Sequence, residues 1–155
     1  MNRFNTISMV VISAVIGLQT GCGSSADEAE KRVIKDVADS HIQANLPDDK
    51  DFDSFLRRDL EKFFSARYSK SVTVRWEVLR QGPTQTGIAY PKYYLWVVVT
   101  EGNAQFSEGA VRLAAIDKKE FDVTDFVDVA DIRASRQDIS SIFPQPVCEK
   151  IRSKL

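Results

Sequence analysis

The residues of this chain that could do chemistry are aromatic side chains and arginines on short extended stretches. Arg112 lies at steps of two from Ala110, Ala114 and Ile116, so we expect it to share one strand face with these small and apolar residues. A guanidinium there needs an acidic partner or an anionic ligand, because burying an unpaired charge is costly. If that face is open, the sequence predicts a site for a small amphipathic ligand, lined by Trp76, Tyr94, Trp96 and Arg112. The alternative is an ion pair within the sheet, with Glu77 as the partner.

A catalytic site is harder to assemble, because the chain contains a single histidine, His41. This residue lies at an apolar position of a predicted helix, and the Gly-x-Ser-x-Gly motif of a nucleophile elbow does not occur. We therefore predict a protein that is not an enzyme. The alternative is a small enzyme that uses an acid and either His41 or a tyrosine as a general acid/base pair in the concave face of its sheet.

Four aspartates at steps of three raise the question of a metal site: Asp122, Asp125, Asp128 and Asp131. A calcium loop needs oxygen ligands over about twelve residues and a glycine for its sharp bend, and this stretch has no glycine. The chain also lacks a cysteine pair or two histidines at helical spacing, which zinc would require. The sequence therefore predicts neither a metal nor a cofactor, and the aspartates are expected to lie on a solvated face.

Two amphipathic helices are predicted to come before the strands. In residues 27–46 the apolar positions recur at steps of three and four, which indicates a helix with one face on a core. That stripe consists of Val33, Ile34, Val37, Ala38, His41, Ile42 and Leu46. A second stripe predicts a helix over residues 53–68, with Asp51 or Asp53 as its N-cap.

The period then changes to two, which indicates strands over residues 72–79, 93–100, 109–116 and 121–124, with Phe126 beyond the last. The run at 93–100 is aromatic and β-branched throughout, as in a central strand covered on both faces. Short helical pieces follow residue 128. The sequence thus predicts one α+β domain over residues 29–155, with N-terminal helices packed on a curved antiparallel sheet of about four strands and short C-terminal helices.

The order of these elements, together with the closing hairpin GAVRLAAIDKKEFDVTDF, resembles the cystatin-like α+β folds. Small domains of the nuclear-transport-factor-like type belong to the same group. The resemblance covers residues 27–126 and implies a sheet with one concave face. In such folds that face is a common place for a small ligand or a dimer partner.

The first 21 residues have the three regions of a secretory signal. Met1 and Arg3 form a positive start, residues 7–18 are apolar, and Gly21 is a small residue at the exit. The apolar run of about 12 residues is too short for a membrane-spanning helix, which needs about 20. We therefore predict a signal peptide over residues 1–21.

The exit of this signal resembles the lipobox of bacterial lipoproteins, because Cys22 follows Gly21 and precedes a small, polar tract. The resemblance implies cleavage before Cys22, lipid attachment to its thiol, and a flexible tether over residues 22–28. It also implies sorting to the periplasmic face of the outer membrane in a Gram-negative host, because Gly23 follows the cysteine. The alternative is a plain secretory signal with Cys22 merely nearby.

Lipid on Cys22 would leave Cys148 without a disulfide partner, so we expect Cys148 to be a small core residue on a C-terminal helix. The charges are mixed along the chain, with a formal net charge of −1, and do not predict a nucleic-acid partner. Together these patterns predict a lipid-anchored cell-envelope protein with a non-catalytic binding role. Its partner is expected to be an envelope protein or a small ligand.

Overall fold

The elements of the fold follow the predicted order of helices, strands and short helices. The structure is a computed structural model that describes residues 24–86 and 88–155, so the predicted signal peptide and Cys22 lie outside the described residues. The chain forms α1 (Ser24–Asn45), α2 (Asp49–Tyr68), β1 (Thr73–Val78), β2 (Lys92–Glu101), β3 (Ala104–Ile116), β4 (Glu120–Asp128), α3 (Val129–Arg133), a 3₁₀ turn η1 (Ile139–Ser141) and α4 (Gln145–Arg152). The predicted α+β class is confirmed.

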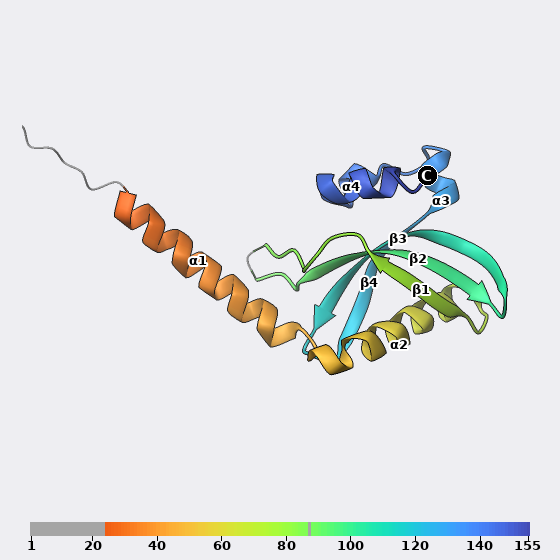
Figure 1. The fold of residues 1–155 in the computed structure, drawn as a ribbon, viewed down its shortest axis with the longest axis horizontal. Coiled ribbons are helices and arrows are strands. Elements are labelled where there is room, and N and C mark those ends of the chain that lie inside the picture. The colour runs from red at the N-terminus through yellow and green to blue at the C-terminus, as the bar shows by residue number, and fades with distance from the viewer. Residues whose placement is uncertain (1–23, 87) are drawn as a thin grey trace, which may run out of the picture.

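The four strands form one antiparallel sheet in the order β1-β2-β3-β4, with β2 and β3 in the centre. Successive side chains alternate between the two faces. Leu95 and Val97 point toward α2, whereas Tyr94 and Trp96 point toward the C-terminal elements. Figure 1 shows α2 on one side of the sheet and α3 and α4 on the other. The prediction that the central strand is covered on both faces is therefore confirmed.

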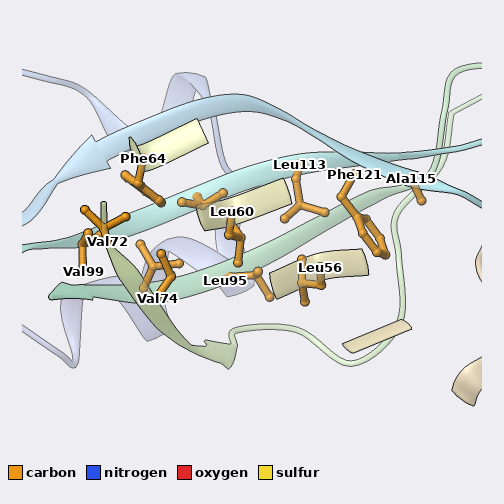
Figure 2. Packing of buried hydrophobic residues seen from close by; sticks show 12 residues of the cluster. Leu56, Leu60, Phe64, Val72, Val74, Leu95, Val99, Leu113, Ala115 and Phe121 are labelled. Carbon is orange, nitrogen blue, oxygen red and sulfur yellow. The ribbon is translucent and has the colours of Figure 1, made fainter. Parts of the chain in front are cut away.

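The larger core lies between α2 and the sheet. Leu56, Leu60 and Phe64 follow one another at helical spacing, so all three point from α2 toward the strands, where they are buried. Figure 2 shows them among the apolar side chains of the sheet. Full burial of such a side chain contributes roughly 1.5–3 kcal/mol. The ring of Phe64 also meets that of Phe126 on β4 edge to face, with centroids 4.9 Å apart.

A second core lies on the opposite face, beneath the C-terminal elements. It is built from Ile139, Phe143, Val147, Cys148 and Ile151, packed on Leu79, Tyr94, Trp96, Ala110 and Val127. The expectation that Cys148 is a core residue is confirmed, because its thiol is buried in α4 and donates to the carbonyl of Phe143 at 3.2 Å. Burial raises the pKa of this thiol, since a thiolate would lose its hydration there.

The prediction that the apolar stripe of the first helix faces a core is wrong for its first three residues. Val33, Ile34 and Val37 are 61%, 61% and 58% exposed. The reason is that α2 already covers the sheet face that the stripe would need, and Figure 1 shows α1 extending away from the sheet. Only the C-terminal end of α1 is fixed to the domain: Asn45 is buried, and its carbonyl and amide oxygens accept from the backbone amides of Lys118 and Asp117.

Several predicted boundaries also change. Residues 24–28 are helical, where a flexible tether is predicted. The second helix begins at Asp49 with Asp48 as its N-cap, so neither Asp51 nor Asp53 caps it. The third strand begins at Ala104 and the fourth ends at Asp128. Both are longer than predicted, because backbone pairing with the neighbouring strands continues beyond the apolar residues on which the predictions are based.

Candidate functional site

Three of the four predicted ligand-binding residues share one sheet face, and that face is filled. Tyr94 lies opposite Arg112 across the β2–β3 ladder, and Trp96 is the next residue of β2 on the same side. Tyr94 is 4% exposed and Trp96 is 5% exposed, because Phe143 and the other C-terminal core residues pack over them. The structure therefore places the chain's own C-terminal segment where a small ligand is predicted.

Arg112 has an acidic partner on the neighbouring strand. Its Nε atom donates to Asp125 at 2.6 Å, and its Nη1 atom donates to the carbonyl of Ile142 at 3.0 Å. The interpretation that Arg112 forms an ion pair within the sheet is confirmed, but the partner is not Glu77, which accepts from Lys154 at 2.6 Å. The guanidinium thus ties β3 to both β4 and the C-terminal segment.

The polar atoms of the two buried aromatic residues also have partners in the chain. The Tyr94 hydroxyl lies 2.6 Å from the Thr84 hydroxyl, and the Trp96 indole N–H donates to Glu108 at 2.6 Å. The Nζ atom of Lys154 lies 5.9 Å from the centre of the Trp96 ring. These contacts hold both rings as part of the second core.

Trp76 does not join the other three residues. It lies on the α2 side of the sheet, where the guanidinium of Arg57 stacks 4.8 Å from its ring centre. Tyr93 is on this side as well, and its pKa is raised by burial and by the charge of Asp49. The aromatic group that looks continuous in the sequence is thus divided between two faces by strand alternation.

His41 lies on α1 and not in either face of the sheet. Its ring stacks on Tyr90 with centroids 6.4 Å apart, and its Nε2 atom is buried without a hydrogen-bond partner in the described part of the chain. His41 and Asp36 both line a shallow hollow of about 510 Å³ along α1. The general acid/base pair of the alternative prediction is expected in the concave face of the sheet, which is not where this histidine lies.

Three of the four aspartates at steps of three have separate structural roles. Asp125 pairs with Arg112, Asp128 caps α3 by accepting from the Ala130 amide, and Asp131 pairs with Arg136. Within residues 24–86 and 88–155, no group of three or more histidine, cysteine and acidic side chains is arranged to hold a metal ion.

A further hollow lies between α2 and the edge strand β4. This α2–β4 groove has a volume of about 580 Å³ and is lined by Asp59, Lys62, Phe63, Ala66, Arg67, Glu120, Phe121 and Asp122. Phe63 and Phe121 make its surface partly apolar. The α2 side carries Lys62 and Arg67, whereas the β4 side carries Glu120 and Asp122, so the two rims have opposite charge.

Asp59 fixes one end of this groove. Its carboxylate accepts two hydrogen bonds from Arg58, at 2.8 and 2.9 Å, and one from the backbone amide of Phe121 at 2.8 Å. Arg58 also donates to the carbonyl of Lys119 at 2.6 Å, and its pKa is raised by the hydrogen bond to Asp59. The one available signal in the sequence is that Asp59 interrupts the apolar stripe of α2, since a carboxylate there needs buried partners.

In comparisons with known proteins, no family model, no curated protein and no solved structure matches the chain. Among the helices of the described residues, none has both the length and the apolar character needed to cross a membrane.

The pairing of Arg112 can be tested with two matched substitutions on β4. Asp125→Asn removes the counter-charge of a partly buried guanidinium, so it should lower the free energy of unfolding by about 1–3 kcal/mol. Asp122→Asn changes an exposed aspartate of the same strand and should stay within about 0.5 kcal/mol of the parent protein. Urea unfolding followed by circular dichroism measures both. Equal losses in the two variants would show that Arg112 does not depend on Asp125.

Proposed function

We propose that this protein is a lipid-anchored cell-envelope protein that binds a protein partner and performs no catalysis. The observation that carries the proposal is the filled face around Trp96. The aromatic residues and the arginine predicted to hold a small ligand are engaged with the chain's own C-terminal segment. The α2–β4 groove remains open at the surface, and its mixture of apolar floor and charged rims suits a polypeptide segment.

The anchor would be the lipid on Cys22, in keeping with the lipobox-like sequence around it. Only Gly23 separates Cys22 from the first residue of α1. A helix of 22 residues is about 33 Å long at ~1.5 Å per residue. With α1 extending away from the sheet, as in Figure 1, an anchored chain would carry its binding domain clear of the lipid surface. In a Gram-negative host the anchor would be in the outer membrane, on its periplasmic face.

The chemistry of the α2–β4 groove specifies what the partner should offer. An apolar side chain could contact Phe63 and Phe121, which form the floor. An acidic residue beside it would face Lys62 on α2, and a basic residue would face Asp122 on β4. Pairs on such exposed rims contribute little affinity, but they select the orientation of the bound segment. The proposed partner is therefore a protein segment with an apolar anchor residue between charges of opposite sign.

The anchor is tested by the intact mass of the full chain purified from membranes. We expect the chain to start at Cys22 and to carry the added mass of acyl groups. Cys22→Ser should abolish that mass and move the protein from the membrane to the soluble fraction, because acyl burial contributes about 0.8 kcal/mol per CH₂ group. A membrane-purified chain with an unmodified Cys22, or one cleaved elsewhere, would refute the anchor.

The groove is tested by filling it from an exposed position. Ala66→Arg places a long side chain in the α2–β4 groove, whereas Ala130→Arg makes the same change on the exposed surface of α3. In quantitative co-purification from the native envelope, Ala66→Arg should lower recovery of the associated protein about tenfold, and Ala130→Arg should leave it unchanged. Retention of the partner by Ala66→Arg would place the binding surface outside this groove.

A further inference from the structure

The exposed apolar residues of α1 form a continuous surface. We call Val33, Ile34 and Val37 the α1 stripe; each is more than half exposed. The hollow of about 510 Å³ beside it is lined by residues at helical spacing, namely Val33, Asp36, Val37, Ser40, His41 and Ala44. A helix that keeps an apolar face in water gains by packing that face against another surface. The α1 stripe is therefore a contact surface without a partner in the described part of the chain.

We propose that the partner of the α1 stripe is α1 of a second copy of this chain, packed parallel to the first. The inference rests on the proposed function, because the lipid on Cys22 would start both helices at the same membrane surface. Since only Gly23 lies between Cys22 and α1, two anchored copies would leave the membrane in the same direction. Confinement to one surface also raises their effective concentration, so a short contact is sufficient.

The spacing along α1 fits such a pair. Val33, Val37, Ser40 and Ala44 are separated by four, three and four residues, which is the spacing of a coiled-coil seam. Glu30 takes the preceding seam position, where two like charges would meet, so the contact begins at Val33. The seam from residue 33 to 44 spans about 17 Å. A contact of this length is weak for free chains and depends on the anchor.

The residues that flank the seam are complementary in a parallel pair. In a parallel coiled coil, the residue at heptad position g of one helix faces the residue at position e of the other helix, five positions later in the sequence. With Val37 at position a, Asp36 is at g and His41 is at e. Asp36 of one copy therefore faces His41 of the other, where the carboxylate accepts a hydrogen bond from the imidazole. By the same rule Ile34 is covered by Ala29 of the other copy. An antiparallel pair over the same seam residues would instead place Gln43 opposite Asp36 and Ile34 opposite His41, so only the parallel pair makes the contact between Asp36 and His41.

A lipid surface is a poorer occupant of the α1 stripe. Helices that lie on anionic membranes carry lysines and arginines beside the apolar face. Here Lys31 is one turn before Ile34, but Asp36 flanks the other edge of the stripe, and Lys35 lies on the opposite side of the helix. The charge pattern thus favours a second α1 over a lipid surface.

Disulfide formation in native membranes tests the pairing on the full, anchored chain. Val33→Cys and Val37→Cys place thiols on the seam, and Lys35→Cys places one on the opposite side of α1. Cys148 is buried, and Cys22 carries the lipid, so neither competes. With a mild oxidant, the two seam variants should form disulfide-linked dimers at least ten times faster than Lys35→Cys. Equal rates at all three positions, or no dimer at Val33→Cys and Val37→Cys, would overturn the proposal.

Mixing two tagged variants decides the orientation. A parallel pair predicts that Val33→Cys links to itself and not to Ala44→Cys, whereas a Val33→Cys to Ala44→Cys product would overturn the parallel arrangement. Intact mass of the same samples separates the two proposals. Acylated Cys22 without seam disulfides rejects the α1 pair alone. Unmodified Cys22 rejects the anchor, and with it the anchored pair that depends on it.

Discussion

The burial of β2 and β3 on both faces is the constraint on which the rest of the structure depends. The apolar side chains of Leu95 and Val97 point to one face, and those of Tyr94 and Trp96 point to the other. The first face is covered by α2, which precedes the strands, and the second by η1 and α4, which follow them. Once both faces are covered, α1 has no sheet surface left to pack on, which leaves its apolar residues exposed. The hollows described above therefore lie at the β4 edge of the sheet and along α1, and not over the centre of either sheet face.

Charged residues secure the two layers at defined points. Asp59 links α2 to the start of β4 through the Phe121 amide, and Arg112 links β3 to Asp125 and to the Ile142 carbonyl. Each of these charges lies among apolar neighbours and is stabilised by partners from another element. The Arg112 contact with Ile142 joins the C-terminal segment to the sheet, and Asp59 lines the α2–β4 groove. Residues that suggested chemistry in the sequence thus act mainly as structural connections.

Local periodicity in the sequence was sufficient to predict the class and order of the fold, because alternation and helical spacing are properties of each segment. Periodicity could not show that the apolar residues of α1 are exposed. The apolar stripes of α1 and α2 look equivalent in the sequence, and the difference arises only in the folded chain, where α2 alone packs on that sheet face. Nor could it place Trp76 and Trp96 on opposite faces, since that depends on strand register. The α2–β4 groove joins residues about sixty positions apart, and Asp59 was its only local sign.

The sheet face around Trp96 is closed by the protein itself, and the binding that we propose takes place elsewhere. Trp76→Phe leaves Trp96 as the only tryptophan, and its fluorescence reports that face directly. The account predicts a blue-shifted emission in the folded protein and weak quenching by acrylamide, with both changing strongly on unfolding in urea. An emission and a quenching rate in the folded variant equal to those of the unfolded chain would contradict it, because the face would then be open to solvent.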